Sequence, residues 1–335
     1  MKHKLFIPFA NVIITGLIAV ECLIALSSCK KLECPAYNNS TPPESPYQDP
    51  VWYPDGTMLF FNHQVVKSVG FDKCDNVSYY DIYPDSSGFW MINKNGTGMR
   101  RVTTFDLLDP AWSPDGKWIA FANGGVIYKM AFNGVNFDTT NIIALTDNNY
   151  NHFYPSWSPN GDTIYYDSNE DAPAHTDFYS IWKMSAGGTG QTRITDTAIV
   201  ISNGDIREPF CIPDGRILHF RYPIGSQQQQ IFIMDANGNN AKQVTQNPAD
   251  FRYDYYLGYF NNRAFYGGQY IYSCDMNGSN VQKIGANHSW GFSISKDGTI
   301  AYINFDGYVV DRTHGTIWLT DINGNVNTPL TYNIY

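Results

Sequence analysis

Asp109-Pro110-Ala111-Trp112-Ser113-Pro114-Asp115-Gly116 is the stretch that decides the fold, because the chain repeats it. A second full copy, Tyr-Pro-Ser-Trp-Ser-Pro-Asn-Gly, runs from Tyr154 to Gly161. In Ser-Pro-Asp-Gly, Pro presets φ, Asp tolerates the third turn position and Gly supplies the left-handed residue. A large aromatic residue precedes the turn and an apolar run follows it, so each copy predicts a β-hairpin.

Further copies bring the total to six. Two of these copies match the pattern well, Asp49–Gly56 and Glu208–Gly215. The other two, Gly258–Asn262 and Ile294–Gly298, are degenerate. After each hairpin comes another apolar strand, and in nearly every unit an Asn-Gly or Gly-Gly turn and a short last strand follow it. Four strands in a unit of about 45 to 55 residues make one blade of a β-propeller. The sequence therefore predicts an all-β fold, a six-bladed β-propeller with four antiparallel strands per blade.

The repeats also predict where the blades begin. We expect these starts near Pro50, Pro110, Pro155, Pro209, Tyr256 and Phe292. The first repeat is stretched between Asn62 and Gly88, where we expect a loop that projects from one face. No helical periodicity of useful length follows residue 30, so less than about a tenth of the mature chain should be helical.

The pattern P-x-W-S-P-D-G, an apolar strand, I-[YW]-x-[MV]-[DN]-x-x-G and L-T resembles the propeller domain of TolB-like proteins. The resemblance covers about residues 45 to 331. The fifth copy lacks Pro and Asp in its turn, and the sixth has Lys296 in place of Pro. TolB carries an additional α/β domain before its propeller, and we expect none here. The resemblance implies six blades and a role as a docking surface.

Charge excludes one class of partner. The 335 residues include 22 Lys and Arg against 31 Asp and Glu, a net charge of −9 at pH 7. A nucleic-acid-binding protein needs a basic stripe to replace condensed counterions, so we expect no nucleic-acid partner. We expect a monomer.

The N-terminus is typical of a targeting segment. A positive start, Met1–Lys4, precedes the mostly apolar run Leu5–Leu26, and Leu-Ser-Ser-Cys ends at Cys29. This pattern predicts a bacterial lipoprotein signal peptide over residues 1–28, cleavage before Cys29 and acylation of that cysteine. An uncleaved membrane helix is the alternative, and Glu21 within the apolar run counts against it.

The remaining chain divides into a tether, residues 29–45, and the propeller, residues 46–331. The tether is rich in Pro, Asn and Ser and too polar to fold alone. Lys30 and Lys31 follow the cysteine directly, and in this the sequence resembles lipoproteins that are transferred to the outer membrane. The predicted location is therefore the cell envelope, at the outer membrane facing the periplasm or the cell surface, with the lipid as the only membrane contact.

Four cysteines would remain beside the acylated one, in an oxidising compartment. Cys34 in the tether and Cys74 in the stretched first repeat could form a disulfide. Cys211 and Cys274 lie in predicted strands, where we expect buried free thiols.

Equivalent positions of a propeller converge on its axis. The residue before each P-x-W opens the innermost strand and should face the central funnel. These positions and their neighbours are Asp49, Asp109, His152, Tyr154, Arg207, Glu208, Asp254 and His288. Such a ring could hold a divalent cation or a cationic ligand group. The alternative is that these side chains cap strands, hold water and, for the histidines, bond locally.

Converging carboxylates should raise at least one carboxylate pKa unless a cation compensates, and Arg207 is expected to pair with a neighbouring acid. Two aromatic runs, Phe251–Tyr256 and Tyr79–Tyr83, form either a wall for a sugar or protein partner or ordinary packing between blades.

Catalytic motifs such as G-x-S-x-G, H-E-x-x-H and the phosphate loop are missing from the sequence, so we assign no catalytic residue. The leading hypothesis is a lipid-anchored envelope scaffold that docks a protein or glycan partner and has no obligatory cofactor. The alternative is a metal-dependent polysaccharide-active enzyme, because similar repeats build oligogalacturonate lyases. Such a site needs three or more histidines, and only His152 and His288 are placed near the axis.

Overall fold

The computed structural model describes residues 45–72, 77–172, 178–195, 205–221, 229–245, 256–267, 270–285, 288–307 and 311–334. The propeller belongs to one compact unit, residues 43–70 and 78–335. Of the other unit, residues 1–42 and 71–77, the structure describes only strand ends. The predicted signal peptide, Cys29, most of the tether, Cys34, Cys74 and Asp254 lie outside the described residues.

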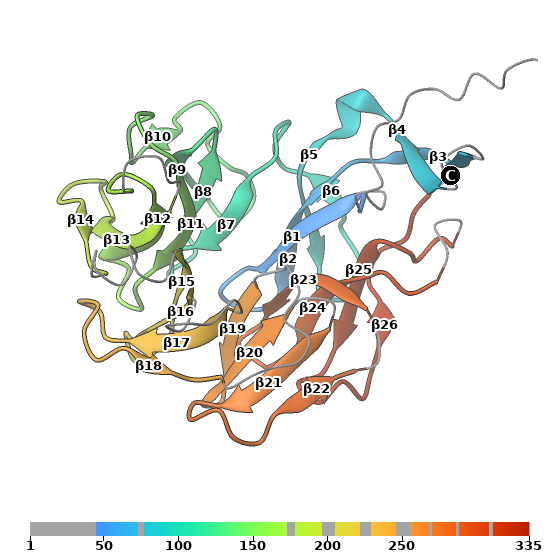
Figure 1. Ribbon diagram of the computed structural model, residues 1–335. Helices are drawn as coiled ribbons and strands as arrows, with labels where there is room; N and C mark the ends of the chain where they lie inside the picture. Colours follow the sequence, from blue (N-terminus) through green and yellow to red (C-terminus); the bar gives the residue numbers. More distant parts are fainter. Residues whose placement is uncertain are drawn as a thin grey trace, which may run out of the picture. The chain divides into compact units, whose positions relative to one another are not determined.

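Six four-stranded antiparallel sheets stand in a ring, which confirms the predicted six-bladed propeller (Figure 1). Its innermost strands begin close to the predicted starts. They are β1 (Tyr47–Trp52), β7 (Leu108–Trp112), β11 (His152–Trp157), β15 (Ile206–Cys211), β19 (Tyr256–Phe260) and β23 (Ser289–Ile294).

Three further strands extend each blade outward. The second strands are β2 (Met58–His63), β8 (Trp118–Asn123), β12 (Thr163–Ser168), β16 (Ile217–Arg221), β20 (Arg263–Gly267) and β24 (Ile300–Asn304). The third strands are β5 (Gly88–Asn93), β9 (Val126–Ala131), β13 (Ser180–Ser185), β17 (Gln230–Met234), β21 (Ile271–Asp275) and β25 (Thr316–Thr320). The outer strands are β6 (Arg100–Arg101), β10 (Ile143–Ala144), β14 (Thr192–Arg193), β18 (Lys242–Gln243), β22 (Gln282–Ile284) and β26 (Thr328–Pro329).

The stretched first repeat differs from the expected loop. It contains two strands, β3 (Val66–Asp72) and β4 (Val77–Ile82), which form a sheet of their own, and the short 3-10 turn η1 (Pro84–Ser86). Valine and aromatic residues in both segments favour extended backbone, which explains the pairing. In the described part of the chain, no helix is long and apolar enough to cross a membrane.

Aromatic side chains fill the space between neighbouring blades. Between blades 1 and 2, Phe60 packs edge-on against Trp112 and Phe132, with ring centroids 5.0 and 5.6 Å apart. Each of the six boundaries has its own buried cluster of this kind. Burial of these rings, at about 25 cal/mol per Å² of apolar surface, is the main force that joins the blades.

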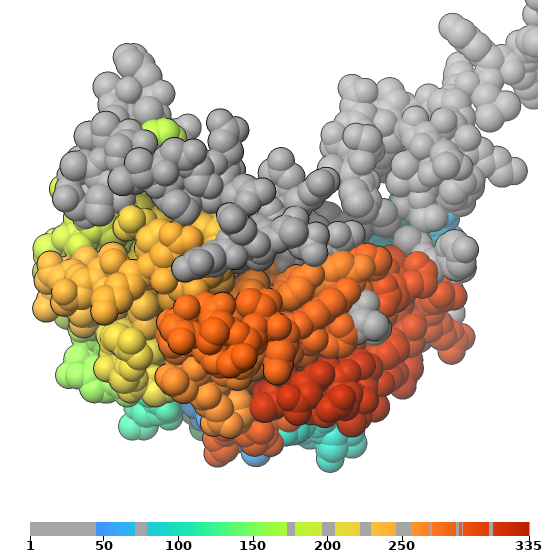
Figure 2. Space-filling view, turned by 60° about the horizontal axis from the view of Figure 1, so that its bottom comes forward, coloured from blue at the N-terminus to red at the C-terminus, as the bar shows by residue number. Residues whose placement is uncertain are grey.

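Two tryptophans of the repeat, Trp157 and Trp52, also bond their blades to the preceding ones. Trp157 Nε1 donates to the carbonyl of Ala111 at 3.1 Å. Trp52 Nε1 donates to the carbonyl of Ser293 at 3.2 Å, which links blade 1 to blade 6. Among the described strands, every blade is built from one continuous stretch, so the ring closes through such contacts and not through a shared sheet. The blade colours accordingly follow sequence order, yellow through orange to red, in Figure 2.

Candidate functional site

Four of the innermost strands bulge at the residue before their proline. The pairing register of β1, β7, β11 and β15 shifts there. The backbone is left-handed at each bulge, with φ of 49° at Asp49 and Asp109, 52° at Tyr154 and 56° at Glu208. This conformation costs a non-glycine residue about 1–2 kcal/mol, and a following proline disfavours it further. Strain of this kind collects at functional sites.

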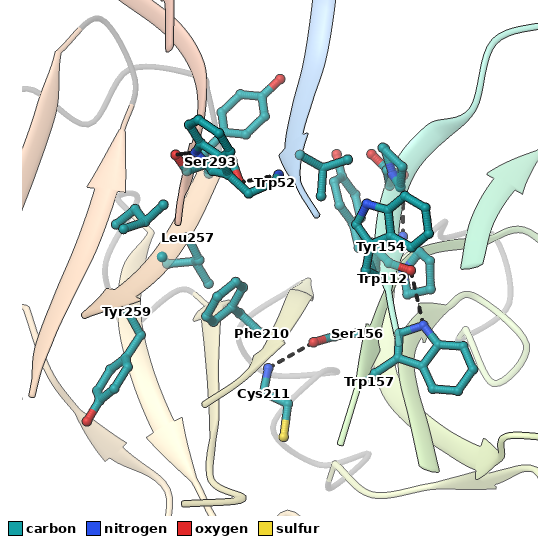
Figure 3. A pocket seen from close by; sticks show the side chains of 18 of the residues that line it. Trp52, Trp112, Tyr154, Ser156, Trp157, Phe210, Cys211, Leu257, Tyr259 and Ser293 are labelled. Carbon is teal, nitrogen blue, oxygen red and sulfur yellow. Dashed lines mark hydrogen bonds between the residues drawn. The ribbon is translucent and has the colours of Figure 1, made fainter. Parts of the chain in front are cut away.

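The same four residues line one central cavity of about 520 Å³, to which all six innermost strands contribute. We call Asp49, Asp109, Tyr154 and Glu208, which come from blades 1 to 4, the acidic arc. Blades 5 and 6 supply an apolar arc: Tyr256, Leu257, Tyr259, Phe292 and Ile294. In Figure 3, Phe210 lies between Leu257 of the apolar arc on one side and Trp112 and Trp157, near Tyr154, on the other.

Carboxyl groups of the acidic arc hold their protons more tightly than usual. Burial away from water raises the pKa of Asp109 to about 8, and the nearby charges of Asp49 and Asp167 add to this rise. A hydrogen bond from the backbone amide of Tyr154 partly opposes it. Withdrawal from water also raises the pKa of Asp49 to about 6, although Asn62 donates to its Oδ2 at 2.9 Å. At neutral pH the arc therefore carries less negative charge than its composition implies.

Behind the arc lies an ion pair. Asp167, on β12, is fully buried, and its Oδ2 accepts from Arg207 Nε and from the amide of Glu208, both at 3.3 Å. Burial raises the pKa of Asp167 to about 6, and Arg207 opposes that shift. The other carboxylate oxygen has no partner among the described residues. The pair holds the bulge of β15 in place, and the Asp167 carboxylate offsets the positive charge that Arg207 brings beside the arc.

Arg207 also stacks on two phenol rings. Its guanidinium carbon lies 4.1 Å from the ring centroid of Tyr179 and 5.7 Å from that of Tyr154. Withdrawal from water, then the charges of Glu208, Asp109 and Asp167, raise the pKa of Tyr154. Tyr154 is thus a neutral hydrogen-bonding group among ionisable neighbours.

The predicted site residues fall into two groups. Asp49, Asp109, Tyr154 and Glu208 line the cavity, and Arg207 sits beside it. His152 and His288 are not among its lining residues.

His152 is 1% exposed and packs edge-on against Tyr166, with centroids 5.6 Å apart. Burial lowers its pKa. It lies two residues before Tyr154, and because the bulge breaks the alternation of the strand, the two side chains do not share a face.

Sequence reasoning missed Asn62 and Asp167. Asn62 binds Asp49 and both backbone groups of Leu107, so it holds one bulge as Asp167 holds another. Both residues stand sixth after a turn glycine, and each is the first polar residue after a run of at least three apolar or aromatic residues. That repeated exception was the signal that could have identified them.

No three His, Cys, Asp or Glu side chains within the described ranges lie close enough to hold one metal ion. Both described cysteines are free: Cys274 is buried, whereas Cys211 is partly exposed and lines the cavity. Burial raises the pKa of the Cys211 thiol to about 12, so it is protonated at neutral pH.

The predicted aromatic walls are only partly described. Phe251–Tyr255 lies outside the described residues, and Tyr256 belongs to the apolar arc. Tyr79 and Tyr83 are about half exposed, at 49% and 51%. Between them, Tyr80 donates its hydroxyl to the carbonyl of His314.

No model of a known protein family and no curated protein matches the chain. Solved structures do match it. TolB from Acinetobacter baumannii is 18% identical with a TM-score of 0.47, over 70% of this chain and 53% of the TolB chain, so the match spans about half of TolB. A structure of a nidogen/laminin complex is 10% identical with a TM-score of 0.55, over 72% of this chain and 88% of that one.

Oligogalacturonate lyase from Vibrio parahaemolyticus is 10% identical with a TM-score of 0.50, over 86% of this chain and 78% of the lyase. At these identities a likeness extends to the fold and not to activity. This chain is a six-bladed β-propeller, and its similarity to these structures is one of fold.

Proposed function

We propose that this chain is a binding propeller of the cell envelope that docks a protein partner through its central cavity. The observation that carries the proposal is that an acidic arc and an apolar arc line a single cavity. A short segment of the partner, with a lysine or arginine beside an apolar side chain, complements both arcs at once.

Two features of the cavity support a protein partner. Its volume of about 520 Å³ suits a few side chains and falls in the usual range of ligand sites, about 300–1,000 Å³. Its walls include tryptophan, phenylalanine and tyrosine, which supply large contact areas at low entropy cost. Hydrogen bonds from Asn62 to Asp49 and from the amide of Glu208 to Asp167 hold two of the surrounding bulges, so the partner would meet a preformed surface.

Protons should compete with the docked cation. Because the pKa of Asp109 is about 8 and that of Asp49 about 6, both groups lose protons over the physiological range. A cation in the cavity favours the ionised form of each carboxyl group and lowers its pKa. Docking should therefore be tighter at about pH 8 than at about pH 6.

Cross-linking in the native envelope tests the docking role. A photoreactive phenylalanine in place of Tyr259, which lines the cavity, should capture one protein. The same group in place of Lys242, on the outer strand β18, should not. Asp109→Asn with Glu208→Gln should abolish the product at position 259. Equal capture at both positions, indifference to the double substitution, or a glycan product would overturn the proposal.

The proposed location depends on Cys29. One diacylglycerol chain pair plus an N-acyl chain gives stable membrane attachment, whereas a single acyl chain does not. Cys29→Ala should leave the precursor unprocessed or release the protein from membranes. Labelled palmitate that still enters the Cys29→Ala protein would show that the anchor lies elsewhere.

A further inference from the structure

A hydrogen-bonded chain of three side chains lies away from the central cavity, on loops of blades 5 and 6. His288 precedes β23, Asp306 follows β24 and Tyr270 precedes β21. His288 Nδ1 lies 2.8 Å from Asp306 Oδ1, and His288 Nε2 lies 2.9 Å from the hydroxyl of Tyr270. Docking at the cavity uses none of these groups.

The partners determine the tautomer of the imidazole. An ionised carboxylate only accepts hydrogen bonds, so Nδ1 of the neutral ring carries the proton and donates it to Asp306. Nε2 is then unprotonated and accepts from the Tyr270 hydroxyl. Asp306 also accepts from the backbone amide of His288 at 3.2 Å, which fixes the histidine further. The order acid, imidazole, hydroxyl is that of a nucleophile with its base and an orienting group.

The surroundings favour reaction at the phenol oxygen. The rings of Tyr270 and His288 are stacked with centroids 4.8 Å apart, and Lys283 Nζ lies 3.1 Å from the centroid of Tyr270. That ammonium group attracts negative charge as it develops on the phenol. The His288 and Asp306 side chains are 41% and 40% exposed, so a small reagent reaches them from solvent.

We propose that Tyr270, His288 and Asp306 form an acyl-accepting site for small activated carboxylic esters. Tyr270 is the nucleophile, His288 is the general base, and Asp306 is a positioning residue. This reaction is independent of the docking role and of the central cavity.

The step balances without a cofactor or an oxidant. The phenol oxygen forms a bond to the carbonyl carbon while its proton moves to His288 Nε2. The bond between that carbon and the leaving oxygen then breaks, and the leaving group takes the proton from Nε2. The products are an O-acyl tyrosine and an alcohol. Water, activated by the same nitrogen, can attack the acyl carbon and restore Tyr270.

The test uses the full-length protein and p-nitrophenyl acetate. Release of p-nitrophenolate gives the rate, and mass spectrometry of peptides locates the acetyl group. We expect acetylation at Tyr270. Tyr83, 51% exposed and without a described imidazole partner, is the internal reference, and Tyr83→Phe should change nothing.

Three variants separate chemistry from structure. Tyr270→Phe should abolish the modification at unchanged melting temperature. His288→Gln should slow it by about 100-fold or more, the range for loss of a general base. Asp306→Asn should also slow it and shift the pH–rate profile, which a purely structural role would not move. Acetylation of Tyr270 no faster than that of Tyr83, acetyl groups on Lys283 instead, or an unchanged rate in His288→Gln would overturn the proposal.

Discussion

The acidic arc and the apolar arc both come from the innermost strands of the repeat, yet the backbone of these strands differs at the residue that bulges in blades 1 to 4. Blades 1 to 4 place a non-glycine residue at left-handed φ before a proline. Blade 6 keeps the register shift but uses Gly291, with φ of 66°, and blade 5 pairs regularly with no shift. The bulge therefore does not require a polar side chain. Left-handed φ at a non-glycine residue occurs in the four blades whose bulged residue lines the cavity, whereas blade 6 has glycine at its bulge and blade 5 has a regular strand.

Loss of the buried ion pair should have the largest effect on the acidic side. Arg207→Met leaves Asp167 buried without its cation, and we expect the free energy of unfolding to fall by about 3 kcal/mol at pH 8. At pH 5 the loss should shrink, because the pKa of Asp167 is about 6 and its carboxyl group is then protonated. Urea unfolding at both pH values measures it.

Arg263→Met is the matched control near the apolar arc. Arg263 pairs with Asp275 at 2.6 Å, but this carboxylate is 34% exposed, whereas that of Asp167 is 0% exposed. We expect Arg263→Met to lower the free energy of unfolding by about 1 kcal/mol or less. Equal losses in the two variants would remove the distinction between a buried acidic side and an ordinary surface.

The pH dependence of stability follows from Asp109. Its pKa rises from an ordinary value of 3.8 to about 8, so the folded state binds more protons than the unfolded state between these values. Stability should therefore fall as pH rises through that window. Asp109→Asn cannot lose a proton, and asparagine tolerates the left-handed backbone. Relative to the unsubstituted protein, the free energy of unfolding of the variant should rise by at least about 1.4 kcal/mol from about pH 4 to pH 8.5. This amount is the free energy of one pKa unit.

Asp235→Asn should show the opposite sign. Backbone amides of Asn237 and Asn239 lower the pKa of Asp235, so its carboxylate stabilises the fold above the ordinary pKa. Parallel unfolding curves for both variants at the two pH values check the signs. A stability of the Asp109→Asn protein that tracks the unsubstituted protein at every pH would show that the acidic arc is solvated like any surface.

The glycine of blade 6 should be needed for its backbone. Gly291→Ala places a Cβ at φ of 66° and 3.2 Å from Tyr256 Cζ, and we expect a loss of about 1–2 kcal/mol. Gly124, at φ of 56° in open space, isolates the backbone cost when it is replaced by Ala. If Gly291→Ala were neutral in thermal unfolding, left-handed φ would cost a non-glycine residue nothing here, and the contrast between blades 1 to 4 and blade 6 would lose its meaning.

The smallest expected effect concerns the tryptophan hydrogen bonds between neighbouring blades. Trp157→Phe removes the hydrogen bond to Ala111, whereas Trp112→Phe removes none, since Trp112 Nε1 has no partner among the described residues. The first should cost about 0.5–1.5 kcal/mol more than the second. Trp52→Phe, which breaks the bond to Ser293 at the boundary of the arcs, should resemble Trp157→Phe. Identical losses in all three would show that packing alone joins the blades.

The fold was readable because its signals are local. Each Ser-Pro-Asp-Gly or Asn-Gly turn specifies a hairpin from a few adjacent residues, and repetition turns hairpins into blades. The same logic placed Asp49 and Asp109 at equivalent positions, and the structure brings them to one cavity. Whether they bind a ligand stays a prediction.

What the sequence could not supply depends on distant partners and on single-residue register. Asp167 meets Arg207 forty residues away in the chain, and no local pattern announces that contact. His288 stands three residues before the bulge at Gly291, so a rule based on position near the axis misplaces it. A bulge shifts the direction of side chains by one residue, and its exact place becomes visible only when the partner strand is known.

Each blade is one uninterrupted stretch of chain, and this has a consequence for rearranged versions of the molecule. New ends introduced between any two blades would cut no ladder of hydrogen bonds. A circular permutant that starts at β7 and ends at β6, with a linker joining the original described ends, would keep all six sheets intact. The seam at Trp52 and Ser293 would then become an ordinary internal boundary, and the boundary between blades 1 and 2 would become the place where the ring is held by side chains alone.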